Sequence, residues 1–122
     1  MDNELTNNEK EDQLLGIHDD DASAMFRAWT VARAAAVARE MGVQLTDAHW
    51  RVIKFIRTHY ANVGPARHAR EYVKVLDKRF ADEGGSRFLY QLFPGGPVKQ
   101  GYAIAGVETP ADVNDKAFGT SL

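Results

Sequence analysis

This 122-residue chain has four histidines that are candidate metal ligands: His18, His49, His59 and His68. Two ligands share one face of a helix when they lie three or four residues apart, and no pair of these histidines has that spacing. We therefore expect no metal site and no bound cofactor. His49 falls at the start of a predicted helix, where packing or capping is a sufficient role for it.

Cysteine is absent from the chain. Its absence excludes disulfides, thiolate metal sites, CxxC redox chemistry and the carriage of a persulfide. The acids within residues 27–103, the body of the chain, fall at predicted helix ends or on solvated faces. No nucleophile elbow or phosphate loop is present in the sequence. The sequence therefore predicts that the protein is not an enzyme.

The charges are distributed unevenly along the chain. Residues 1–26 hold eight acids against one lysine, a net charge of −7, whereas residues 27–103 hold thirteen Lys and Arg against six acids, a net charge of +7. Such a division indicates either a face that binds polyanions or a face that the acidic arm masks. A third interpretation is that these bases lie on ordinary solvated helix faces, because several of them have acids at helical spacing.

Hydrophobic periodicity predicts an all-α fold. Apolar side chains recur at helical spacing over residues 21–41, 46–62 and 66–80, and shorter helices are expected at 86–93 and 98–105. The apolar residues 14–17 leave open a small β element near the N-terminus. We expect three parts: an acidic mobile arm at 1–20, a helical domain at 21–93, and a C-terminal arm at 94–122.

No stretch approaches the roughly 18 apolar residues that a membrane helix needs, and the first residues are acidic rather than basic and apolar. We therefore expect a cytoplasmic protein that does not bind membranes.

The second and third predicted helices, joined at Gly64, resemble a helix-turn-helix element. In a DNA-binding version the third helix would present its first turn to the bases and its later side chains to the phosphates. The candidate DNA-binding residues are Arg67, His68, Arg70, Lys74 and Lys78. Helix pairs of this kind also occur in many folds that never meet DNA.

Residues 45–50 read LTDAHW, residues 88–100 read FLYQLFPGGPVKQ and residues 104–106 read IAG. These three segments are similar to the DsrC/TusE family, which includes the dissimilatory sulfite reductase gamma subunit and the related sulfur-relay protein. The family has an LTEEHW-like helix start, an LFPxGPAKQ segment and IAGLPKP. Trp29 also falls where the family places a tryptophan, so the resemblance covers about residues 29–110.

The resemblance implies a small helical fold with a helix-turn-helix-like element and a flexible C-terminal arm that carries the working sulfur. The complete family form has one cysteine after the KQA segment and another near the chain end, and the sulfur-relay form keeps the latter. The matching positions here are Tyr102 and Val113. Neither side chain can hold a persulfide or form a disulfide, so the carrier activity of the family is excluded.

These observations predict a non-catalytic, cysteine-free relative that acts as a regulator, adaptor or competitor in sulfur metabolism or sulfur relay, through a protein partner and without a small-molecule substrate. The alternative is a DNA-binding transcriptional regulator. We expect the partner to bind mainly through the body, with the arm displaced or held back on its own domain. The candidate partner-binding residues are Lys74, Lys78, Lys99, Gln100, Tyr102 and Ile104.

Overall fold

The computed structural model describes residues 21–113, and these residues form helices and turns without a strand. This confirms the predicted all-α class; the β element considered at residues 14–17 and the arm at 1–20 lie outside the described residues. The α-helices are α2 (Asp21–Arg27), α3 (Val31–Glu40), α4 (Asp47–Val63), α5 (Ala69–Arg79) and α6 (Ser86–Leu92). A short 3₁₀ turn, η1 (Ala81–Glu83), precedes α6, and a π-helical turn, η2 (Pro97–Tyr102), follows it.

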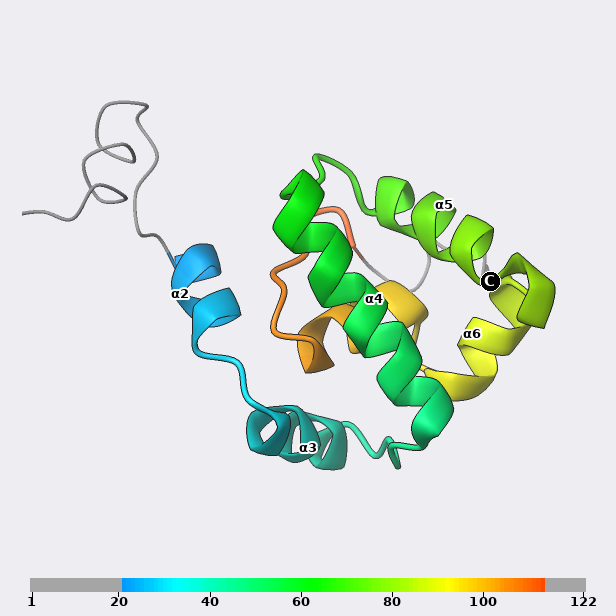
Figure 1. The fold of residues 1–122 in the computed structure, drawn as a ribbon, viewed down its shortest axis with the longest axis horizontal. Coiled ribbons are helices and arrows are strands. Elements are labelled where there is room, and N and C mark those ends of the chain that lie inside the picture. Colours follow the sequence, from blue (N-terminus) through cyan, green and yellow to red (C-terminus); the bar gives the residue numbers. More distant parts are fainter. Residues whose placement is uncertain (1–20, 114–122) are drawn as a thin grey trace, which may run out of the picture.

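The η2 turn is the centre of the domain. It packs against α4, α5 and α6, and Figure 1 shows it behind α4, on the same side of the molecule as α5 and α6. Val98 and Tyr102 of η2 and Ile104, Ala105 and Val107 after it are each at most 1% exposed. Apolar side chains buried to this degree contribute stability in proportion to the area removed from water, so η2 is part of the core.

The flexible C-terminal arm expected from residue 94 onward is therefore corrected as far as Val107. Close approach of the chain at Gly106 contributes to the difference: a Cβ there would lie 2.7 Å from Trp29 Cδ1, and the residue has a φ of +75°. Glycine at this position lets the segment pass against the Trp29 side chain. Residues 114–122 lie outside the described residues.

The single helix expected over residues 21–41 is also corrected, because it is interrupted between α2 and α3. Thr30 has an extended backbone, and its Oγ1 accepts the Arg33 backbone N–H at 3.0 Å, which caps α3. Trp29, immediately before the cap, donates its indole N–H to the Ile104 carbonyl oxygen at 2.8 Å. A local cap and a contact with the distant η2 segment thus outweigh the helix propensity of the alanine-rich stretch.

His49 has the capping role expected from the sequence. Its Nδ1 accepts the Thr46 backbone N–H at 3.0 Å, and its Nε2 lies 2.7 Å from the Leu92 carbonyl oxygen. Because Nδ1 is an acceptor, the proton must be on Nε2, which donates to Leu92. The side chain therefore joins the start of α4 to the end of α6.

Arg57 of α4 joins three segments of the chain. Its guanidinium carbon lies 3.9 Å from the centroid of the Phe26 ring and 4.3 Å from that of the Trp29 ring. The same group donates hydrogen bonds to the carbonyl oxygens of Ala105 at 2.8 Å and Phe26 at 3.0 Å. Partial burial lowers the pKa of Arg57 from its ordinary value, although an arginine stays charged at neutral pH.

We predict that Arg57→Ala lowers the free energy of unfolding by about 1–3 kcal/mol, because it leaves two carbonyl groups without their charged donor. Arg57→Lys keeps the charge but cannot form the two-pronged arrangement, so its loss should be intermediate. Urea unfolding followed by circular dichroism measures both effects. Lys54→Ala, at an exposed position of the same helix, is the control. Equal stability of Arg57→Ala and wild type would contradict this role.

Candidate functional site

Tyr102, at the first position that the family resemblance assigns to a thiol, is a core residue. Its ring stacks on Tyr72 of α5, with ring centroids 4.2 Å apart and an interplanar angle of 22°. Both side chains are at most 2% exposed, and the Tyr102 hydroxyl has no hydrogen-bond partner among the residues that the structure describes. Burial raises the pKa of Tyr102 far above its ordinary value, and the neighbouring Tyr72 raises it further, so the phenol stays neutral.

Tyr72 ties this stack to the loop before α5. Its hydroxyl accepts the Ala66 backbone N–H at 3.1 Å. Burial raises the pKa of Tyr72, while the hydrogen bond from Ala66 acts in the opposite direction. The pair of rings therefore fixes the loop, α5 and η2 relative to one another.

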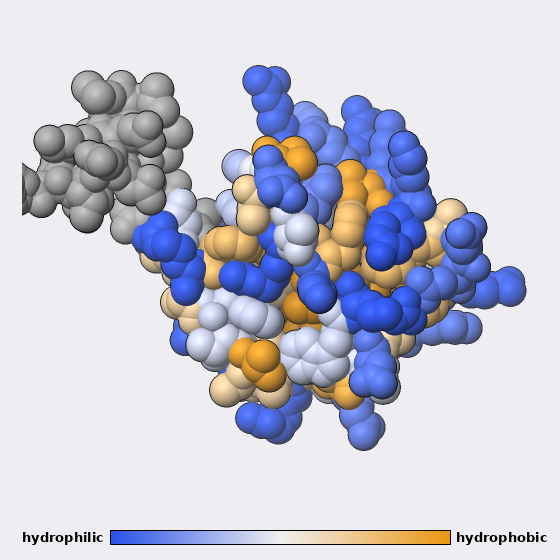
Figure 2. All heavy atoms as spheres, viewed as in Figure 1, coloured by the Kyte–Doolittle hydropathy of each residue, from blue (hydrophilic) through white to orange (hydrophobic). Residues whose placement is uncertain are grey.

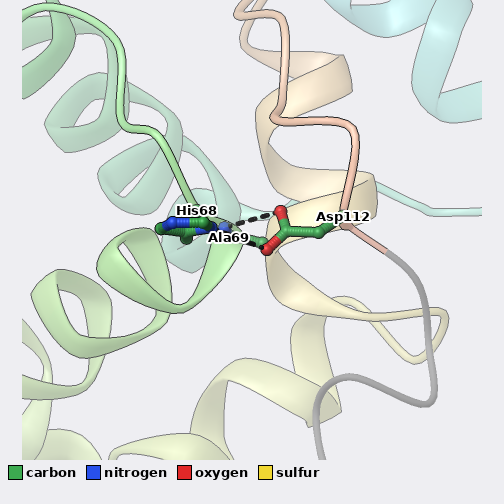
Figure 3. A network of polar contacts seen from close by, with 3 residues as sticks. All are labelled: His68, Ala69 and Asp112. Carbon is green, nitrogen blue, oxygen red and sulfur yellow. Dashed lines mark hydrogen bonds and ion pairs between the residues drawn. The ribbon is translucent and has the colours of Figure 1, made fainter.

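Val113, at the second position that the family resemblance assigns to a thiol, directly follows Asp112, whose carboxylate contacts the N-terminus of α5 (Figure 3). His68 precedes α5 but provides no side-chain cap. Asp112 supplies it instead: Oδ1 accepts the Ala69 backbone N–H at 3.0 Å, and Oδ2 lies 3.3 Å from His68 Nδ1. Val113 itself is partly buried and packs against the core.

The Ala69 N–H lowers the pKa of Asp112 from its ordinary value, and the hydrogen bond and charge of His68 act in the same direction. A carboxylate at the positive end of a helix dipole is the favoured arrangement. Asp112 was not among the residues predicted from the sequence. A signal for it was present, because α5 has no Ser, Thr, Asp or Asn at its N-cap and so requires a partner from elsewhere.

The candidate residues of the predicted arm have different environments. Tyr102 and Ile104 are buried and present no surface to a partner. Gln100 is half-buried, and its Oε1 accepts the Gly95 backbone N–H at 2.9 Å. Lys99 is exposed. Only Lys99 among these four is freely presented on the surface, because the others belong to the core or to the turn at Gly95.

The candidate residues of the body form an exposed basic row along α5. Arg70, Lys74 and Lys78 are spaced by four residues, so their side chains follow one another along the helix surface. Arg67 and His68 are exposed in the loop before the helix. The structure thus brings the basic candidates together on one face.

The same region gives no support to a compact helix-turn-helix. Both α4 and α5 pack against η2, and α4 is 17 residues long. The N–H of Ala69 at the start of α5, which could otherwise bind a phosphate, is already occupied by Asp112.

No group of three or more metal-binding side chains occurs within residues 21–113. No helix in that same part of the chain is long and apolar enough to cross a membrane.

This geometry defines a small helical domain in which an aromatic and an aliphatic side chain occupy the two positions that the family resemblance assigns to thiols. Residues 12–113 match the family described as "DsrC like protein", and the chain belongs to this family.

Individual relatives agree with this assignment. The protein described as sulfurtransferase TusE of Pectobacterium atrosepticum is 40% identical over 84 residues, which covers 68% of this chain and 77% of the relative. The TusE of Salmonella typhimurium is 41% identical over 83 residues, covering 67% and 76% of the two chains. The NMR structure of Allochromatium vinosum DsrC is 34% identical, with a TM-score of 0.60 over 71% of this chain and 79% of that one.

We predict that Tyr102→Cys destabilises the protein by about 2–5 kcal/mol, because it removes a buried ring and leaves a cavity. The new thiol should react with an aromatic disulfide reagent far more slowly in the folded protein than in urea. Tyr102→Phe is the matched control: it keeps the stack and removes an unpartnered hydroxyl, so its stability should stay within about 1 kcal/mol of wild type or exceed it. A stable, rapidly labelled Tyr102→Cys protein would show instead that this segment leaves the core readily.

We further predict that Asp112 contributes to the pH dependence of stability. Because its pKa is lower in the folded protein than the value of about 3.9 expected for an unfolded chain, its contribution is complete above that value. The contribution is lost as the pH falls through the folded pKa. Asp112→Asn keeps an oxygen acceptor but no charge, so wild type should be the more stable at neutral pH. The difference in urea midpoint should shrink on acidification, and a difference that does not change with pH would contradict this.

Proposed function

We propose that this chain is a non-carrier member of the DsrC-like family that acts as a regulator, adaptor or competitor in sulfur relay or sulfur metabolism. The observation that carries the proposal is the loss of every thiol from the 122-residue chain, together with the conversion of the first thiol position into the buried ring of Tyr102. A side chain stacked in the core cannot be delivered to a partner without unfolding the segment that holds it.

The surface available to a protein partner belongs to the body. If the segment after Phe93 were a free arm, truncation there would leave the folded domain intact. The truncation would instead remove the buried side chains of Val98, Tyr102 and Ile104 from the core. Recognition of this chain therefore depends on exposed groups, and the basic row at Arg70, Lys74 and Lys78 places three of one charge on one helix face. An exposed row of one charge favours partners of the opposite charge and steers their association.

A competition experiment tests this proposal. Sulfur transfer is reconstituted with a thiol-bearing family member, its persulfide donor and its acceptor, and this protein is added in excess. We expect transfer to fall, because the two relatives share a docking surface for the same partner. Intact-mass spectra of the same samples should show sulfur added to the relative and none stably added to this protein, since it has no thiol.

The matched variants locate the docking surface. Lys74→Glu combined with Lys78→Glu should weaken competition about tenfold, the equivalent of about 1.4 kcal/mol. Lys54→Glu, at an exposed position of α4, should compete like wild type. Undiminished transfer in the presence of excess wild type, or stable sulfur adducts on this chain, would overturn the proposal.

The alternative function is that of a DNA-binding regulator, because the exposed basic row could contact phosphates. A gel-shift measurement at low salt decides it. Binding that falls steeply with salt and is lost in the Arg67→Ala, Arg70→Ala double variant would replace the present proposal with a transcriptional role.

A further inference from the structure

A groove of about 240 Å³ lies between α5, α6 and η2, next to the basic row. Its floor is mostly apolar and includes Val73 and Leu76 of α5, Leu89 and the ring of Tyr90 of α6, and Pro97 and Val98 of η2. Leu76, Leu89 and Val98 are each at most 2% exposed, so the floor is continuous with the core. An apolar floor on a rigid support binds an apolar group with little rearrangement.

Polar groups stand at the edge of this groove. Arg70 lines one part of it and Asp77 and Ser86 line another. The Ser86 hydroxyl donates to Asp77 Oδ1 at 2.9 Å, which partly satisfies the carboxylate. Arg70 is therefore the exposed charged group of the edge whose side chain can turn toward a ligand.

Four exposed bases and one exposed acid, Glu71, are direct neighbours in the chain of residues that line the groove. Lys74 and Lys78 follow Arg70 along α5. Lys99 comes directly after the floor residues of η2, and Arg87 comes directly after Ser86. These four basic side chains are exposed. Figure 2 shows hydrophilic side chains projecting around α5, with apolar ones visible between them. Asp77 is the single acid among the lining residues named for the groove. The edge thus complements a negatively charged ligand on more than one side.

We propose that this groove is a docking site for an acidic peptide segment of a partner protein that inserts one bulky apolar side chain. The volume is smaller than the roughly 300–1,000 Å³ typical of small-molecule pockets, which fits one side chain rather than a whole metabolite. The apolar floor takes that side chain, and the bases on α5, α6 and η2 take the acids that flank it. This inference rests on the proposed function, because it names the partner chemistry that the non-carrier body recognises.

Methyl NMR spectroscopy of the full chain tests the docking site. The probe is the synthetic peptide Ac-Glu-Asp-Glu-Phe-Glu-Asp-Gly-NH₂. It should cause saturable shifts of the methyl signals of Val73, Leu76, Leu89 and Val98. The same peptide with alanine in place of phenylalanine, and a version with lysines in place of its acids, should each bind at least about tenfold more weakly.

Two protein variants separate filling of the groove from loss of a hydrogen bond. Ser86→Tyr places a ring at the mouth of the groove and should abolish the shifts. Ser86→Ala removes the same hydrogen bond to Asp77 without filling the space, so it should bind the peptide like wild type. Ser86 is exposed, and circular dichroism checks that both variants remain folded.

Several results would overturn the inference. Peptide binding unaffected by Ser86→Tyr would place the ligand elsewhere. Groove methyl shifts that change in the free protein on Phe118→Ala would show that the chain's own residues fill the groove, and shifts that depend on protein concentration would assign it to a second copy. If Ser86→Tyr competes fully in the sulfur-transfer assay, the docking site fails while the proposed function stands.

Discussion

The stacking of Tyr102 on Tyr72 is the contact on which the arrangement of the domain depends. It holds α5 on η2, and η2 in turn supports α4 and α6. Offset aromatic pairs contribute about 0.5–1.5 kcal/mol beyond the area that they bury. The larger effect here is geometric, because the segment that resembles a carrier arm becomes the layer between the two longest helices. The basic row and the groove then have fixed positions relative to each other.

The sequence was sufficient to predict the elements whose signals are local. Residues 47–63 show the helical period of apolar side chains after a threonine, and they form α4. The break at Trp29 and Thr30 was missed, because the contact that favours it is made with Ile104, 75 residues away in the chain. Thr30, a residue type favoured at N-caps, was the local signal for the break, but without that contact it did not decide between one helix and two.

The difference between local signals and contacts between distant segments also decides which parts of the candidate site could be predicted. The basic residues of α5 could be grouped from their spacing alone, because a helix places residues four apart on one face. The groove could not, since its walls come from α5, α6 and η2. The resemblance to the family also favoured a free arm, whereas Gly106 permits a close approach to Trp29 that only the folded chain reveals.

The cap on α5 has a consequence for the order in which the protein acquires its structure. Asp112 follows Ala69 by 43 residues, so α5 leaves the ribosome without the carboxylate that completes its first turn. The η2 layer beneath it is also synthesised later than the helices that it supports. A nascent chain that ends before η2 exposes the apolar sides of α4 and α5, and such surfaces are the ones that chaperones hold. The cap on α5 and the η2 layer are therefore completed only after the residues up to Asp112 have been synthesised.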